Sequence, residues 1–180
     1  MQFKLIPLSF AALALTLGAS STAQAEDLLV RIGHTGPLSG SNAYAGKDNE
    51  NGVRMGVEAV NAARMMVGGK TLKFEMVSED DQCDPKAGVA VAQKMVDAGI
   101  KYVMGPYCSG VAIPASKVYN EGNAILSTVG SNPKVTMGGY KSVFRIVAGD
   151  NLIGTTMAQY AVNTMKAKTA GVIDDRTAFG

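Results

Sequence analysis

The sequence predicts an α/β fold, in which a parallel β-sheet carries helices on both of its faces. The first observation is that stretches with the alternation or the short apolar run of a β-strand recur along the chain. The second is that stretches with the 3.6-residue period of an amphipathic helix separate them. Because parallel strands are joined by crossover helices, this order favours a parallel sheet covered on both sides.

The first expected elements are a strand, a helix and a strand. The sequence predicts a strand over 28–34, LLVRIGH, and a helix from Lys47 to about Met66. The apolar face of that helix has the spacing i, i+4 and i+7, at Val53, Val57 and Val60. A strand follows at 71–80, where apolar residues alternate with polar ones at Leu72, Phe74 and Met76.

The second half of the chain continues the same order. Pro85 opens a helix in its first turn, where proline is tolerated, and Gly99 ends it. The apolar face of this helix is Val89, Ala92 and Val96. A third helix is expected over 109–120 and a fourth from Asp150, with Ile153, Met157 and Tyr160 on one face. The remaining strands are expected at 102–105, 124–130, 142–149 and 169–175.

The N-terminus has the three parts of a secretory signal peptide. Lys4 supplies the positive charge, LIPLSFAALALTLG is an uncharged apolar run, and Ala23-Gln24-Ala25 is a cleavage site. The alternative is a membrane anchor, but the run is shorter than the ~20 apolar residues that a spanning helix requires. We therefore expect residues 1–25 to be removed on export, so that the mature chain begins at Glu26.

Composition and motifs argue against several functions. The formal net charge is only +2, the basic residues are scattered, and tryptophan is absent, so no nucleic-acid surface is expected. The sole histidine, His34, has no partner at metal-ligand spacing, and we expect a strand-end residue with a satisfied hydrogen bond rather than a metal ligand. No Ser-His-Asp or Cys-His arrangement is present, so neither catalytic residues nor a cofactor are expected.

The stretch GPLSGSNAYAGKDNENG, residues 36–52, resembles a phosphate-binding loop only in part. Five residues separate Gly40 from Gly46-Lys47, where a P-loop has four, and Asp48 stands where Ser or Thr would hold magnesium. The stretch is instead expected to be a strand-to-helix loop. Such a loop leaves helix N-terminal amides free, and these amides favour an anion such as a carboxylate.

The two cysteines, Cys83 and Cys108, both follow expected strand ends. An even number in an exported chain predicts one disulfide bond. Two free buried thiols are the alternative. The acidic residues 79–81 and Asp84 do not have the ligand spacing of an EF-hand, so we expect a solvated loop there.

Ligands of parallel sheets bind beyond the carboxyl ends of the strands. The expected ends are 34–44, 78–83, 105–109 and 127–132, and most are rich in Ser, Thr, Gly or Asn. These residues let a ligand approach the backbone, but they also cap helices and form turns. The strand at 169–175 has no helix after it to bury both faces, so we expect a piece of a longer protein whose second domain begins near Asp150.

The stretch DDQCDPKAGVAVAQKMVDAGIKYVMGPYCSG, residues 80–110, resembles the branched-chain amino-acid-binding proteins of bacterial ABC transporters, the Leu/Ile/Val-binding and leucine-specific type. Further matches are GPLSG after the first strand, PAS at 114–116, SNP at 131–133 and FR at 144–145. The resemblance implies a type I periplasmic binding fold, a two-lobed clamshell that closes on its ligand about a hinge. It also implies a first lobe over 26–149 and an incomplete, truncated second lobe over 150–180.

The resemblance implies that Ser109, Gly130 and Ser131 hold the carboxylate and ammonium groups of an amino acid. Tyr44 matches an aromatic residue beside the ligand's apolar side chain, and Phe179 stands where relatives often have tyrosine. Thr128-Val129 replaces a Pro-Gly pair of the relatives. The implied partners are a small amino-acid ligand and the permease subunits of an ABC transporter at the inner membrane, for a monomeric protein in the periplasm.

Two other functions remain open from the sequence. The same fold can bind another small solute, such as an amide, urea or an aromatic acid, because contacts with a head group do not specify the rest of the ligand. An exported enzyme is the other alternative, with catalytic residues outside this sequence.

Overall fold

A computed structural model describes residues 27–180 of the chain. The predicted signal peptide, 1–25, lies outside the described residues. The strands are β1 (Leu28–Gly36), β2 (Met66–Val67), β3 (Lys70–Asp80), β4 (Tyr102–Met104), β5 (Ile125–Thr128) and β6 (Val143–Arg145). The helices are α1 (Ala43–Ala62), α2 (Pro85–Asp97), α3 (Ser109–Glu121), α4 (Lys134–Met137) and α5 (Asp150–Asn163).

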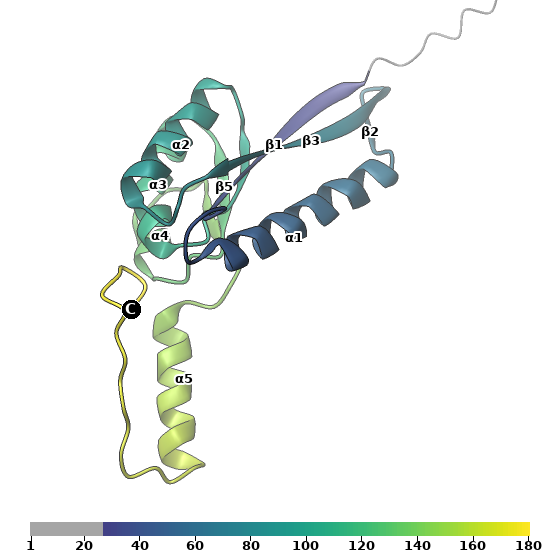
Figure 1. Cartoon of the computed structure of the whole chain (residues 1–180). Coiled ribbons are helices and arrows are strands. Elements are labelled where there is room, and N and C mark those ends of the chain that lie inside the picture. Colours follow the sequence, from purple (N-terminus) through teal and green to yellow (C-terminus); the bar gives the residue numbers. More distant parts are fainter. Residues whose placement is uncertain (1–26) are drawn as a thin grey trace, which may run out of the picture.

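The strands form one sheet in the order β2-β3-β1-β4-β5-β6. All pairs are parallel except β2 and β3, which form a short antiparallel hairpin that the sequence pattern did not predict. As Figure 1 shows, α1 lies on one face of the sheet, and α2 and α3 lie on the other. The predicted α/β architecture is therefore confirmed, with a mixed rather than a purely parallel sheet.

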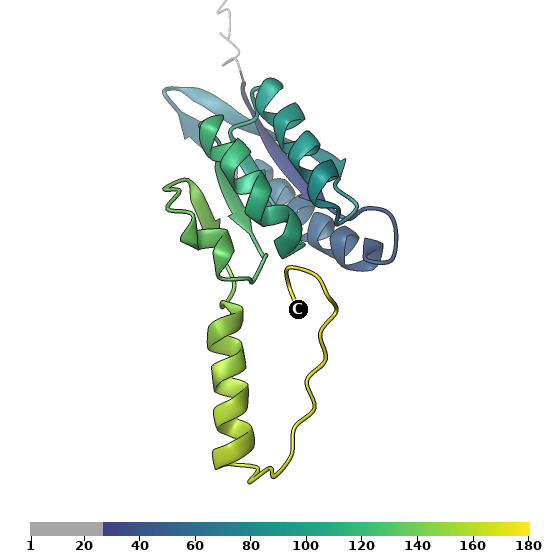
Figure 2. The same cartoon turned by 90° about the vertical axis from the view of Figure 1, so that its left-hand side faces the viewer.

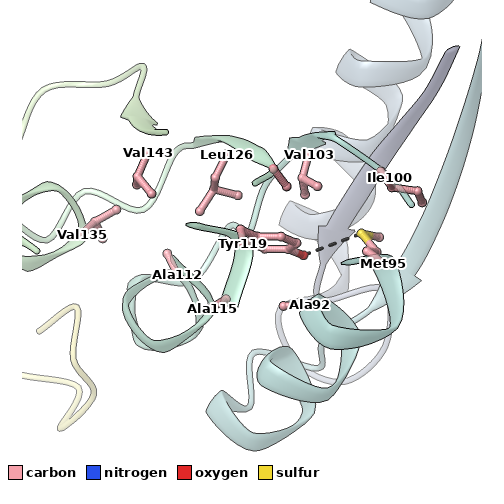
Figure 3. Close-up of a cluster of buried hydrophobic side chains, with 11 residues drawn as sticks. Ala92, Met95, Ile100, Val103, Ala112, Ala115, Tyr119, Leu126, Val135 and Val143 are labelled. Carbon is pink, nitrogen blue, oxygen red and sulfur yellow. Dashed lines mark hydrogen bonds between the residues drawn. The ribbon is translucent and has the colours of Figure 1, made fainter. Parts of the chain in front are cut away.

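The core lies between the sheet and the α2–α3 pair (Figure 3). Tyr119 of α3 is its largest fully buried side chain, and its hydroxyl donates to the sulfur of Met95 in α2 at 3.6 Å. Leu126 of β5 and Val103 of β4 face the same core. The alternate side chains of these strands point the other way, because successive residues of a strand face opposite sides. There they are exposed: Tyr102 and Met104 of β4, Ile125 of β5 and, in the neighbouring strand β6, Phe144.

Several boundaries differ from the predictions. Helix α1 begins at Ala43 and not at Lys47, so Gly46 lies inside its first turn and not in the loop. The expected strand 142–149 is only three residues long, because the chain leaves the sheet after Arg145. The short helix α4 was not predicted.

The predicted strand at 169–175 is wrong. This segment forms no regular structure, and Val172 and Ile173 are 94% and 98% exposed. A strand requires a hydrogen-bonded neighbour, and no strand of residues 27–180 pairs with this segment. The helix predicted from Asp150 is confirmed as α5, but none of its residues is buried.

Helix α5 projects away from the sheet, and the chain then returns to the sheet's end (Figures 1 and 2). The return is anchored where the Asn132 amide donates to the carbonyl oxygen of Ala178 at 2.6 Å. The division into lobes at residue 150 stays a prediction. Within residues 27–180, no helix combines the length and the apolar character that crossing a membrane requires.

Candidate functional site: a cleft at the carboxyl end of the sheet

A cavity of about 750 Å³ lies beyond the carboxyl ends of the parallel strands. The loops that follow β1, β3, β4, β5 and β6 all reach it, together with the returning C-terminal segment. Its lining is Asn42, Tyr44, Cys83, Pro85, Tyr107, Cys108, Ser109, Gly110, Val129, Ser131, Val147, Asp175, Thr177, Ala178 and Phe179. Strand-end geometry therefore predicted the location of the cavity.

One wall is built by the disulfide bond between Cys83 and Cys108, whose Cα atoms are 5.6 Å apart. The predicted disulfide is confirmed. It joins the loop after β3 to the residue that precedes α3. The first turn of α3, which follows Cys108 directly, is thus linked covalently to the neighbouring loop.

The first turn of α3 presents unpaired hydrogen-bond donors at this wall. The backbone N–H groups of Val111 and Ala112 bond the carbonyl oxygen of Cys108, but those of Ser109 and Gly110 have no acceptor within residues 27–180. Both residues line the cavity. A helix N-terminus with free amides and a positive dipole end favours an anion.

The side chain of Ser109 adds a further donor. Ser109 is 2% exposed, and its Oγ accepts a hydrogen bond from the backbone N–H of Asn132 at 3.2 Å. The same oxygen does not cap α3, whose N-cap is Cys108 without a side-chain bond. Since Oγ already accepts from the backbone, its hydroxyl proton can be donated to a ligand.

The opposite wall is the loop between β5 and α4. Ser131 lines the cavity, and no described residue accepts a hydrogen bond from its backbone N–H. Gly130 does not line the cavity: it is buried against the start of α3, and a Cβ at this position would lie 3.1 Å from that of Ala112. The structure thus brings Ser109 and Ser131 together and places Gly130 behind them.

Aromatic and aliphatic side chains form the remainder of the lining. Tyr44, in the first turn of α1, is 77% exposed at the mouth, and Phe179 comes from the C-terminal segment. Sequence reasoning missed Tyr107, Val129 and Val147, which also line the cavity. Tyr107 and Val129 could have been found, because both lie in the strand-end segments 105–109 and 127–132.

The acidic residues at the end of β3 and directly after it do not form the solvated loop that we expected. Asp81 is fully buried, and its carboxylate accepts hydrogen bonds from the Thr35 hydroxyl and the Cys83 N–H, each at 2.9 Å. Burial raises the pKa of the Asp81 carboxyl, against the opposite effect of these two bonds. Asp84 caps α2 by accepting from the N–H groups of Lys86 and Ala87.

Asp80 fixes the loop that leads to Tyr44. Its carboxylate accepts from the Leu38 N–H at 2.8 Å, the Ser39 hydroxyl at 2.5 Å and the Gln82 N–H at 2.9 Å. Burial acts upward on the pKa of Asp80, but these bonds hold it below its ordinary value. The acidic residues are therefore structural supports of the cleft, and residues 27–180 contain no cluster suited to a metal ion.

His34 lies under α1, outside the lining of the cavity. It is fully buried, and its Nδ1 is 3.0 Å from the Ser78 hydroxyl, so the expected hydrogen bond is present. His34 is not the strand end that we expected, because β1 continues to Gly36. Nε2 has no partner among the described residues. Burial lowers the pKa of His34, and the nearby Glu50 carboxylate opposes the shift.

Comparison with known proteins agrees with this geometry. Residues 29–180 match the profile of the periplasmic binding protein family. The chain is 39% identical to an amino acid binding protein of Pseudomonas aeruginosa over 184 residues, which covers all of this chain and 48% of that protein. It is 38% identical over 165 residues to the leucine-specific-binding protein of Salmonella typhimurium, which covers 91% of this chain and 43% of that protein.

A solved structure gives the same fold. The branched-chain amino acid transporter substrate binding protein LivJ of Streptococcus pneumoniae, in complex with isoleucine, superposes with a TM-score of 0.71 at 24% identity. The superposition covers 78% of this chain and 40% of that protein. The chain likewise spans slightly less than half the length of the two curated relatives. With a family profile matched over residues 29–180, this chain belongs to the periplasmic binding protein family, a family of solute-binding proteins with the type I periplasmic binding fold.

Proposed function

We propose that this protein is the periplasmic solute-binding component of an ABC importer and that it binds the branched-chain amino acids leucine, isoleucine and valine. One observation carries the proposal: the free amides of Ser109 and Gly110 and the Ser109 hydroxyl converge on a cavity whose other lining residues are largely apolar or aromatic. This combination suits a ligand with a carboxylate at one end and a hydrocarbon side chain at the other.

The roles of the lining residues follow from their chemistry. Ser109 and the N–H of Ser131 donate to the ligand's carboxylate. Carbonyl oxygens of the loop that contains Gly130 are acceptors for its ammonium group. Tyr44 and Phe179 pack against its side chain. The permease of the importer then receives the ligand from the monomeric binding protein, and no covalent chemistry takes place.

The relatives support the class of ligand. The Salmonella protein is named leucine-specific-binding, and the Pseudomonas protein is named amino acid binding. An aromatic acid is the second candidate for the same cleft, because Tyr44, Tyr107 and Phe179 all line it. Both ligands share the carboxylate, but the aromatic acid lacks the ammonium group and places a ring where leucine has its aliphatic side chain.

Calorimetric titration of the natural gene product tests the proposal. Leucine is compared with leucinamide, which lacks the carboxylate, and with isovalerate, which lacks the ammonium group. We expect leucine alone to bind tightly. Equal binding of leucine and leucinamide would refute the role of the α3 N-terminus, and preference for benzoate over leucine would favour the second candidate.

The variant Ser109→Ala should weaken leucine binding about 10- to 150-fold, since a hydrogen bond to a charged group contributes about 1.5–3 kcal/mol. Ser116→Ala is the matched control. Ser116 is a buried serine of the same helix whose hydroxyl donates to the Ala112 carbonyl at 2.6 Å, and it does not line the cavity. If both variants bind leucine like the parent, Ser109 does not contact the ligand.

A further inference from the structure

Thr128, at the end of β5, does not line the cavity. It nevertheless bonds three segments beside the cavity, namely the β4–α3 loop, the β5–α4 loop and the segment between β6 and α5. Its side chain is 1% exposed. We infer that Thr128 is a positioning residue of the cleft, whose single hydroxyl sets the distance between Ser109 and Ser131. The inference rests on the proposed function in that ligand affinity is one of its two readouts.

The hydroxyl of Thr128 joins two of these loops directly. It donates to the carbonyl oxygen of Pro106, in the loop between β4 and α3, at 2.6 Å. It accepts from the backbone N–H of Gly130, in the loop between β5 and α4, at 2.9 Å. Because a hydroxyl has one proton, its donation to Pro106 leaves the oxygen as acceptor for Gly130, and both bonds are defined in direction.

The backbone of Thr128 reaches the third loop. Its carbonyl oxygen accepts from the N–H of Ile146 at 3.1 Å, at the start of the segment between β6 and α5. One residue thus holds the loop before Ser109, the loop before Ser131 and the segment that leads to α5. Replacing the hydroxyl by a methyl group would leave the buried Gly130 N–H and Pro106 carbonyl without partners.

A second bond between the two loops depends on the first for its geometry. The Asn132 N–H donates to Ser109 Oγ at 3.2 Å, at the long end of the ordinary range, so a shift that separates the two loops weakens this bond. Gly130 lies between the two bonds and packs closely on α3, since a Cβ added at this position would lie 3.4 Å from the Cα of Ser109. Loss of the Thr128 hydroxyl therefore changes the spacing of the donors that face the ligand.

The test compares Thr128→Val, which removes the hydroxyl and keeps the shape, with Thr128→Ser, which keeps the hydroxyl and removes the methyl group. We expect Thr128→Val to weaken leucine binding by about tenfold or more and Thr128→Ser to stay within about twofold of the parent. Val103→Ala is the control, since Val103 is a buried core residue of the neighbouring strand β4 and should lose stability without losing affinity.

Hydrogen exchange of the Gly130 amide, which bonds the Thr128 hydroxyl, is the second readout in the free protein. Exchange should be faster in Thr128→Val than in Thr128→Ser. Equal affinity and equal exchange in the two variants would overturn the inference, as would an equal loss of affinity in Val103→Ala. If Thr128→Val does not fold, Thr128→Ala takes its place, and binding equal to that of Thr128→Ser overturns the inference.

A parent protein that binds none of the three amino acids would refute the proposed function and not this inference. Amide exchange then decides the role of Thr128, because that measurement requires no ligand.

Discussion

Cys83 and Cys108 form a disulfide bond that links the loop after β3 to the start of α3, across 25 residues of sequence. The loop that it closes contains all of α2 and β4. The bond thus restricts the unfolded chain and at the same time holds one wall of the cleft.

Reduction of this disulfide should lower the free energy of unfolding by about 3 kcal/mol on the chain-entropy model. Urea unfolding of the oxidised protein and of Cys83→Ser/Cys108→Ser measures the difference. Thiol titration of denatured, unreduced protein should find no free thiol. Two titratable thiols in that assay would contradict the disulfide.

Stability should fall as the pH drops through the range of a normal histidine. Burial holds the pKa of His34 in the folded protein below the ordinary value of 6.5. As the pH falls through about 6.5, the unfolded chain takes up a proton first, and the folded state loses stability until the lower pKa is passed.

Urea unfolding at about pH 7.5 and about pH 5.5 measures this effect. His34→Gln, which does not titrate and can still bond Ser78, should show the smaller decrease. The buried Asp81 acts in the opposite sense to His34. Its pKa is raised, so it lowers the stability of the protein as the pH rises, at pH values nearer the ordinary carboxyl range. If the free energy of unfolding depends on pH in the same way in the parent and in His34→Gln, protonation of His34 does not cause the loss of stability.

Asp80→Ala should destabilise the protein by about 2 kcal/mol. The three groups that donate to the Asp80 carboxylate lose their charged acceptor, and water replaces these hydrogen bonds only in part. It should also increase proteolytic cleavage within 37–42. Asp97→Ala is the control, since exposed Asp97 accepts a hydrogen bond only from the Gln93 amide within the described residues. Similar losses in both variants would show that the loop does not depend on Asp80.

Local signals allowed much of the fold to be predicted. Asp84 and Pro85 have the chemistry of an N-cap and a first helical residue, and α2 begins there. The start of α1 was predicted four residues too late, because Gly46 lowers helix propensity. In the structure Gly46 lies within the helix, where its lack of a side chain allows the close approach of Pro37. The strand expected at 169–175 has a suitable pattern, but a pattern alone does not provide a strand to pair with.

The location of the cleft could be predicted from the ends of the expected strands and from the family resemblance. The cysteines, Ser109 and Ser131 were singled out in this way, and all four line the cavity, whereas their contact with a ligand stays a prediction. The burial of Asp81 was not, because its partner Thr35 lies 46 residues away and no local pattern links them. The contact of Thr128 with Pro106 spans 22 residues and was missed for the same reason.

Two glycines of α1 should respond in opposite ways to substitution by alanine. Alanine favours the helix by about 0.5–1 kcal/mol over glycine, so Gly56→Ala should be stabilising, as no atom lies within 4 Å of its new methyl group. At Gly46 the same methyl group would overlap the carbonyl oxygen of Pro37. Gly46→Ala should therefore destabilise by about 1–3 kcal/mol despite the better helix propensity, because helix and loop must move apart. Thermal and urea unfolding of the two variants measure this difference. Stabilisation by both substitutions would show that α1 does not approach Pro37 so closely, and the position of Tyr44 at the mouth of the cleft would then be wrong as well.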